Sequence, residues 1–166
     1  MSFPHVPILS PIYTPELHKD DYIADPRTQH QSFGYVPLMK SRQILLPEGH
    51  IYLRAGRQMG RNKGYGVRHI WEQHFHELPS WGCRTVNEVA AYVASVIVHK
   101  AAIYCEFHQT KNGYRIAVLR SAKGVVILEP IVDDSSGQAF YSVVTAYRIN
   151  RRGHGTQVGK VIGNAE

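Results

Sequence analysis

The central third of the chain has the periodicity of helices. Val67, Trp71, Phe75 and Leu78 lie at i, i+4, i+8 and i+11, which places them on one stripe of an α-helix. Pro79 follows at once and cannot continue the helix. The pattern therefore predicts a first helix that begins near residue 65 and ends before Pro79.

A second helix is predicted over residues 86–100. Thr85, with Glu88 three residues later, forms a capping box, in which two side chains satisfy backbone N–H groups at the start of a helix. Six apolar residues form one face that we expect to pack on a sheet: Val86, Val89, Ala90, Val93, Ala94 and Ile97.

After residue 100 the period changes to two, which is typical of strands. Apolar and polar residues alternate over 103–108. Asn112-Gly113 then predicts a two-residue hairpin, because a type I′ turn needs positive φ at both central residues. Further strands are predicted over residues 114–120, 125–129 and 139–149. Since short connections join the four strands, we expect an antiparallel meander with one face under the helices.

The predicted fold class is α+β, with N-terminal helices packed on a four-stranded antiparallel β-sheet. Seven of the nine prolines lie in the first 50 residues and disfavour helix and central strand alike, so residues 1–42 are predicted to be an extended arm. Residues 43–152 form the predicted domain, beginning with two short strands over 43–46 and 50–53. Residues 153–166 are predicted to be a flexible, glycine-rich tail.

Composition limits the class of protein. Hydrophobic residues make up 43% and charged residues 19%, which suits a packed core and argues against a disordered chain. There is no apolar run of the roughly 18–20 residues that span a bilayer and no signal-peptide pattern, so we expect a cytoplasmic protein without membrane insertion. Delivery into the cytoplasm of a target cell is compatible with this. Two cysteines, Cys83 and Cys105, are too few for a disulfide scaffold. A single disulfide between them is an alternative, but two reduced thiols are favoured.

Positive charge is concentrated in two groups. The net charge is +6, which leaves nucleic acid, an anionic membrane or an acidic partner open. The first group lies in residues 54–68, which contain no acidic residue: Arg54, Arg57, Arg61, Lys63 and Arg68. The other lies near the end: Arg148, Arg151, Arg152, His154 and Lys160. Because the two groups flank a histidine-rich segment, they favour a phosphate-binding cleft over solvated surface charge.

The first predicted helix carries the candidate chemistry. Its first amides, together with Arg68, would form an anion site, and His69 would reach a phosphate bound there. His69 is expected opposite the Trp71 and Phe75 stripe, where an ordinary surface histidine would also lie. His74 falls near the middle of the apolar face, where a hydrogen-bonded core histidine is the alternative.

The last predicted strand offers complementary groups. Tyr141, Thr145 and Tyr147 share one face, either for packing or for contact with phosphate, and the strand ends near Arg148. Arginines and a lysine on neighbouring strands would add positive charge. The predicted RNA- or phosphate-binding residues are Arg57, Arg61, Lys63, Arg68, Arg115, Lys123 and Arg148.

Residues 66–70, Gly-Val-Arg-His-Ile, with His74 five residues after the first histidine, resemble the amino-terminal signature of the barnase/EndoU/colicin/RelE-like (BECR) ribonucleases, in particular their phage and polymorphic-toxin branches. The predicted helices, sheet and terminal strand are also similar to that fold, over about residues 51–149. The resemblance implies a metal-independent endoribonuclease without a cofactor that acts as a bacterial toxin. Its implied partners are an RNA substrate, with tRNA among the candidates, and a cognate immunity protein.

The resemblance also implies roles for individual residues. In such enzymes the ribose 2′-oxygen attacks its own phosphate and leaves a 2′,3′-cyclic phosphate, which requires a base, an acid and cations. The implied catalytic residues are His69, His74, Arg120, Thr145 and Tyr147. His69 would be the leading acid/base, and His74 its partner or the buried residue that orients it. Arg120 or Arg68 would neutralise the phosphorane, Thr145 would bind a non-bridging oxygen, and Tyr147 would position phosphate or stack a base.

Two other interpretations stay open. A non-catalytic nucleic-acid-binding or regulatory module on the same scaffold would use the same basic residues. A zinc-dependent nuclease would need ligands such as His69, His74, His76 and His108, but the sequence has neither a His-Glu-x-x-His motif nor a cysteine pair. ADP-ribosylation is disfavoured, because no convincing set of Arg, Ser-Thr-Ser and Glu occurs in strand order.

Overall fold

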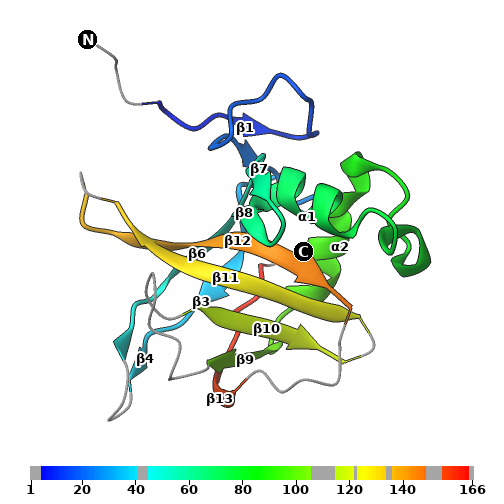
Figure 1. Cartoon of the computed structure of the whole chain (residues 1–166). Helices are drawn as coiled ribbons and strands as arrows, with labels where there is room; N and C mark the ends of the chain where they lie inside the picture. Colours follow the sequence, from blue (N-terminus) through cyan, green and yellow to red (C-terminus); the bar gives the residue numbers. More distant parts are fainter. Residues whose placement is uncertain are drawn as a thin grey trace.

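A mixed β-sheet is the centre of the fold in a computed structural model of the chain (Figure 1). The structure describes residues 5–40, 45–105, 115–121, 123–133, 136–148 and 155–164. Within these residues the main sheet has nine strands, in the order β1-β2-β6-β12-β11-β10-β9-β13, and β3 pairs with β6 beside this path.

The middle of the sheet is an antiparallel meander. Its strands are β9 (Ala102–Cys105), β10 (Ile116–Arg120), β11 (Gly124–Val132) and β12 (Ala139–Tyr147), and each pairs antiparallel with the next. Beyond β9 the sheet continues with β13 (Thr156–Lys160), which is antiparallel to β9. The predicted Asn112-Gly113 turn lies outside the described residues.

The other side of the meander is extended by N-terminal strands. β6 (Gly49–Arg54) runs parallel to β12, which makes the sheet mixed. β6 also pairs antiparallel with β2 (Tyr22–Ile23) and β3 (Ser32–Val36), and β1 (Leu9–Ser10) pairs parallel with β2. Ile23, Phe33 and Val36 are buried, so this part of the chain contributes to the hydrophobic core.

The predicted fold class, N-terminal helices on a four-stranded antiparallel sheet, is wrong: the meander is only part of a larger mixed sheet, and strands dominate the described chain. Residues predicted to be an extended arm and a flexible tail supply β1 to β3 and β13. Strands of two to five residues, two of them interrupted by a glycine, show too few alternations to be recognised from sequence, so their pairing is decided by tertiary contacts.

Two short helices lie near the carboxyl end of β12 (Figure 1). α1 (Gly66–His74) is followed by a 3₁₀ turn over Leu78–Trp81. The predicted capping box of Thr85 and Glu88 is confirmed, but it opens a 3₁₀ turn over Val86–Glu88 before α2 (Val89–Val96). The second helix is therefore shorter than predicted, because the backbone of Ile97 leaves the helical region at φ −83° and ψ 80°.

The buried face of α1 differs from the predicted stripe. Val67 and Ile70 are buried, as is His69, whereas Phe75 at the end of the helix is 47% exposed. Trp71 packs against the core only in part. The helix ends at His74, before the predicted stripe does. His69 is covered because the segment that contains Gln58 and Gly64 packs against it.

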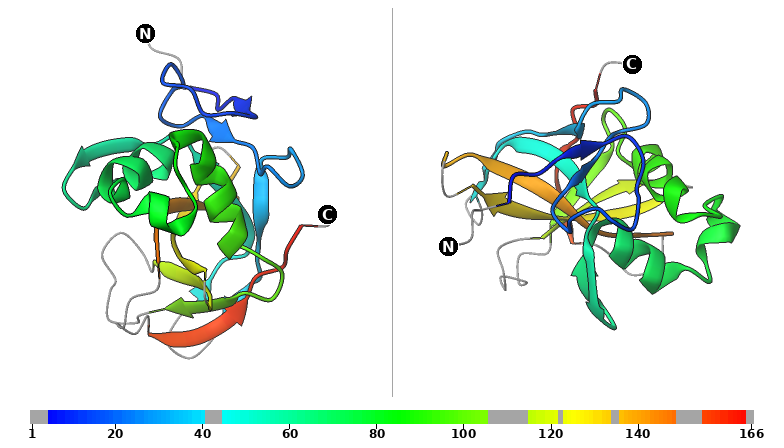
Figure 2. Two further views of the ribbon diagram at one scale, coloured as in Figure 1. Left: turned by 90° about the vertical axis from the view of Figure 1, so that its right-hand side faces the viewer. Right: turned by 90° about the horizontal axis from the view of Figure 1, so that it is seen from above.

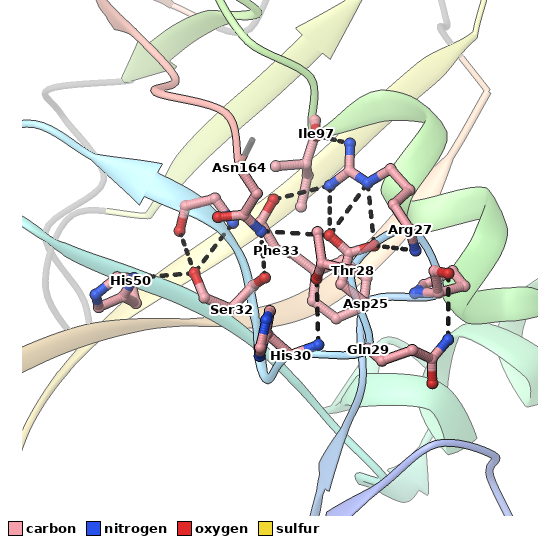
Figure 3. A network of polar contacts seen from close by, with 12 residues as sticks. Asp25, Arg27, Thr28, Gln29, His30, Ser32, Phe33, His50, Ile97 and Asn164 are labelled. Carbon is pink, nitrogen blue, oxygen red and sulfur yellow. Dashed lines mark hydrogen bonds and ion pairs between the residues drawn. The ribbon is translucent and has the colours of Figure 1, made fainter. Parts of the chain in front are cut away.

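A buried ion pair ties distant segments together (Figure 3). Arg27 donates hydrogen bonds to the carboxylate of Asp25, to the carbonyl of Phe33 in β3 at 2.9 Å and to the carbonyl of Ile97 after α2 at 2.8 Å. Asn164 near the C-terminus donates to Asp25 as well. Asp25 is fully buried, so these contacts hold the N-terminal loop, α2 and the C-terminal segment against one another.

Cys83 and Cys105 are both buried and are not joined in a disulfide, which confirms reduced thiols over a disulfide bridge. Across the described parts of the chain, neither helix has the length and apolar character required to traverse a lipid bilayer.

Candidate functional site

A short hairpin projects beside α1 (Figure 2). It consists of β7 (Arg57–Gly60) and β8 (Lys63–Tyr65), and we call it the basic hairpin because Arg57, Arg61 and Lys63 are exposed on it. At its tip, the backbone N–H of Asn62 donates to Gln73 Oε1 at 3.0 Å, and Gln73 Nε2 donates to Asn62 Oδ1 at 3.0 Å. The side chain of Gln73 on α1 thus fixes the tip.

The base of the same hairpin holds His69. Nδ1 of His69 lies 2.6 Å from Oε1 of Gln58. Because a carbonyl oxygen only accepts hydrogen bonds, Nδ1 must carry the hydrogen, and Nε2 of the neutral ring is left as an acceptor. Gly64 makes the close approach feasible: its φ is +142°, and a Cβ there would lie 3.0 Å from Nδ1 and 2.1 Å from the carbonyl oxygen of Arg57.

The surroundings of His69 favour its neutral form. Its exposed fraction is only 4%, and burial is the largest cause of a pKa below the ordinary histidine value. The positive charges of His74 and Arg115 lower the pKa of His69 further. A neutral imidazole with one fixed tautomer is suited to accept a proton at Nε2.

His74, the last residue of α1, connects the helix with β12. Its Nε2 lies 3.3 Å from Oγ1 of Thr145, and its Nδ1 lies 3.8 Å from a carboxylate oxygen of Glu77. Burial lowers the pKa of His74, and the carboxylate of Glu77 opposes that shift. The ring centre lies 6.1 Å from that of Tyr147 and 5.8 Å from that of Trp81. His74, Thr145 and Tyr147 are thus brought together, as the sequence predicts.

The strand register adds Arg115 to this face of the sheet. Thr145 pairs with Ile127, and Ile127 pairs with Ala117, so the three side chains point to one face. Arg115 lies two residues before Ala117 and is exposed, which places it on the same face. Its effect on the pKa of His69 agrees with this position.

Arg120 does not lie with these residues. It is an odd number of positions from Ala117, so its side chain points to the opposite face of the sheet, and its Nη1 donates to the carbonyl of Ser95 on α2 at 2.6 Å. Arg120 therefore links the sheet to α2 and does not lie beside His69 or His74.

Arg68 is occupied by structural contacts as well. Its guanidinium donates to the hydroxyl of Tyr13 at 3.0 Å and to the carbonyls of Gly56 at 2.9 Å, Pro15 at 3.0 Å and Leu17 at 2.5 Å. It therefore holds the N-terminal segment to the start of α1, and we leave it out of the candidate phosphate-binding residues.

A second group of predicted cations lies beside His74. Lys123 and Arg148 line a cavity of about 290 Å³ together with Trp81 and Tyr92, whose ring centres are 5.7 Å apart with an interplanar angle of 26°. Glu88 also lines it. We call this the aromatic–basic cavity. Since Trp81 contacts both His74 and Tyr92, the cavity adjoins the His74 end of the site.

The zinc alternative requires several ligand atoms close together. Within the described chain, the group with suitable geometry is His5, His18 and Asp21, whose ligand atoms lie within 4.8 Å of one another. It does not include His69 or His74. The fourth histidine of the zinc alternative, and most of the second basic group, lie outside the described residues: His108, Arg151, Arg152 and His154.

No protein-family model, curated protein or solved structure matches this chain. The function is therefore inferred from the geometry of the chain's own residues.

Three residues of the site were not predicted from the sequence. No sequence pattern indicates a role for Gln58, because its contact with His69 depends on how the hairpin packs against α1. Trp81 follows the helix-ending Pro79 at a position that predicts only a turn. Tyr92 could have been noted as an aromatic residue with a polar tip on an otherwise apolar helix, since a buried tyrosine hydroxyl needs a partner, here the carbonyl of Lys123 at 3.2 Å.

Proposed function

We propose that the chain is a metal-independent endoribonuclease. One observation carries the proposal: a buried histidine, His69, has its tautomer fixed by Gln58 and its pKa lowered, next to an exposed basic hairpin. Histidine serves well as a general base when it is neutral at working pH and has a free ring nitrogen. Cations next to it would hold the phosphates of a nucleic-acid strand, a polyanion that fits this charge pattern.

The proposed reaction assigns each proton to a residue. Nε2 of His69 takes the proton of the ribose 2′-hydroxyl, whose oxygen attacks the neighbouring phosphorus. His74 gives a proton to the departing 5′-oxygen. Burial lowers the pKa of both histidines; at His74 the carboxylate of Glu77 opposes that shift, whereas at His69 neighbouring cations add to it. The P–O5′ bond breaks, leaving a 2′,3′-cyclic phosphate and a 5′-hydroxyl. Arg115 and the hydroxyl of Thr145 would stabilise the negative oxygens of the phosphorane.

Binding of the RNA strand is assigned to two surfaces. Arg57, Arg61 and Lys63 of the basic hairpin would contact phosphates by charge, without selecting a base. In the aromatic–basic cavity, a base would stack on Trp81 while Lys123 and Arg148 hold a flanking phosphate. The site between them would then receive the phosphodiester that is cut.

The biological setting is part of the proposal. An endoribonuclease of this kind would act as a toxin in a cytoplasm, where RNA such as tRNA is accessible. A cognate immunity protein would neutralise it most directly by covering the exposed basic hairpin with an acidic surface.

Replacing Gln58 with leucine tests the proposed role of the fixed tautomer. We expect RNA cleavage to fall by roughly 10–100-fold, because Nδ1 loses its acceptor and the ring can take the unproductive tautomer. RNA affinity should be unchanged, as measured by fluorescence anisotropy on an uncleavable 2′-deoxy strand. The matched control is Gln73→Leu, which removes the other amide contact between the hairpin and α1. Equal losses in the two variants would show that Gln58 only holds the hairpin.

The titration of His69 gives a second prediction. Because burial and neighbouring cations lower its pKa, we expect an NMR titration of the ring to have its midpoint below the ordinary value of about 6.5. The acid limb of kcat/KM should follow the same pKa. The folded state holds this ring neutral while the unfolded state takes up protons, so His69 also makes the free energy of unfolding fall as pH drops below about 6.5. A midpoint above that value would contradict the assignment as a buried base.

A non-catalytic nucleic-acid-binding module is the second candidate. The exposed cations of the basic hairpin and the stacked Trp81–Tyr92 pair favour it equally, because neither requires chemistry. Binding of RNA without new ends would support this candidate.

A further inference from the structure

A separate cavity lies at the opposite end of β12 from the histidines. Its volume is about 720 Å³, and Phe140 lines it from the start of the strand. Tyr147, beside His74, is seven residues further along, which is roughly 23 Å in an extended strand. The proposed ribonuclease site therefore does not use this cavity.

Aromatic rings form one wall of the cavity. The ring centre of Tyr52 lies 4.7 Å from that of Tyr22 and 5.4 Å from that of Phe140. The planes of Tyr22 and Phe140 are 68° apart, and His50 and Tyr35 continue the wall with planes 74° apart. All five of these residues line the cavity, which gives it a wall of π-systems, and π-systems attract cations.

The charged groups of the cavity are acidic. Glu48 and Asp133 line it, and no lysine or arginine is among its lining residues in the described chain. The hydroxyl of Tyr35 donates to Glu48 at 2.6 Å, which holds that carboxylate at the wall and raises the pKa of Tyr35. The hydroxyl of Ser136 donates to Asp133 at 3.0 Å. A chain with a net charge of +6 thus has a cavity whose own charges would repel a phosphate.

We infer that this cavity binds an alkylammonium ion, with the charged head against the rings of Tyr22, Tyr52 and Phe140 and near the carboxylate of Glu48. Aromatic faces together with a carboxylate are the chemistry that selects ammonium over neutral or anionic groups of similar shape. The ion would be either a free quaternary ammonium compound or a lysine side chain of another protein. This inference does not depend on ribonuclease activity.

The test compares choline with 3,3-dimethylbutan-1-ol, which has nearly the same shape and no charge. Binding is followed by NMR at pH 8, where an ordinary histidine is neutral, on the ring protons of Tyr52 and Phe140. We expect choline to bind about tenfold or more tightly than the neutral alcohol. A parallel titration with Nα-acetyl-lysine amide distinguishes the two sources, because the tighter ligand identifies the class of ammonium group.

Conservative variants locate the binding site. Glu48→Gln removes one negative charge from an exposed side chain and should weaken choline binding several-fold. The matched control is Glu16→Gln, an exposed glutamate that does not line the cavity, and it should leave affinity unchanged. Equal affinity for choline and the neutral alcohol, no perturbation of the cavity rings, or preferential binding of adenosine monophosphate there would each overturn the inference.

Discussion

The variant His69→Ala is expected to cleave RNA about 10²–10⁴-fold more slowly than the wild-type protein, the range over which a positioned acid/base residue accelerates proton transfer. The loss follows from geometry: His69 offers a free Nε2 in a fixed tautomer, beside Arg115 and the basic hairpin. RNA affinity should change little, because the phosphate-binding residues remain. Initial rates on a fluorescent RNA, under single-turnover conditions, measure the effect on chemistry separately from binding.

A histidine on the same segment provides the control. His76 is exposed, and its ring contacts that of Phe75. His76→Ala should therefore cleave at nearly the wild-type rate. Loss of activity in both variants, or in neither, would remove His69 from the proposed mechanism. Circular dichroism on each variant separates a chemical effect from unfolding, which matters because His69 is buried.

The largest expected effect on stability comes from Arg27→Ala. The substitution leaves the carboxylate of Asp25, which is fully buried, without its ion pair. Removing one partner of a buried ion pair costs about 3–5 kcal/mol of the free energy of unfolding. Two backbone carbonyls, of Phe33 and Ile97, lose their donors as well. Urea denaturation followed by tryptophan fluorescence measures the change.

Two comparisons separate charge from geometry. Arg27→Lys keeps the charge but cannot reproduce the forked contacts, so it should be destabilised by less than the alanine variant yet clearly below wild type. Arg84→Ala, at an exposed arginine, should change stability by roughly 0.5 kcal/mol or less. A neutral effect of Arg27→Ala would mean that the network in Figure 3 does not tie the N- and C-terminal segments to the core.

Local elements were the part of the fold that the sequence predicted best. The capping box at Thr85 and Glu88 and the meander of β9 to β12 depend on neighbouring residues, and both occur in the structure. The fold class was wrong because β6 pairs in parallel with β12, with paired residues 90 positions apart in the chain, through contacts that have no local signature. β1 to β3 were not predicted either, because the prolines of this segment disfavour strands and the pairing of these strands also depends on non-local contacts.

The candidate site shows the same division. His74, Thr145 and Tyr147 were predicted to lie together, and strand alternation plus one helix position brings them together. Arg68 was predicted from its place at the helix start and Arg120 from the family resemblance, and neither indicates whether a guanidinium already has partners. In the structure both guanidinium groups donate hydrogen bonds to backbone carbonyls, Arg68 to that of Gly56 and Arg120 to that of Ser95. Gln58 was missed because only the packing of the basic hairpin on α1 brings it to His69.

The chemical identity of RNA ends is the most direct test of the proposed function. Purified protein is incubated with a defined RNA in the presence of a metal chelator, and the products are analysed by mass spectrometry. The proposal predicts 2′,3′-cyclic phosphate and 5′-hydroxyl ends from the wild-type protein, and none above background from His69→Ala. Intact RNA, or ends that carry a 5′-phosphate and a 3′-hydroxyl, would contradict it.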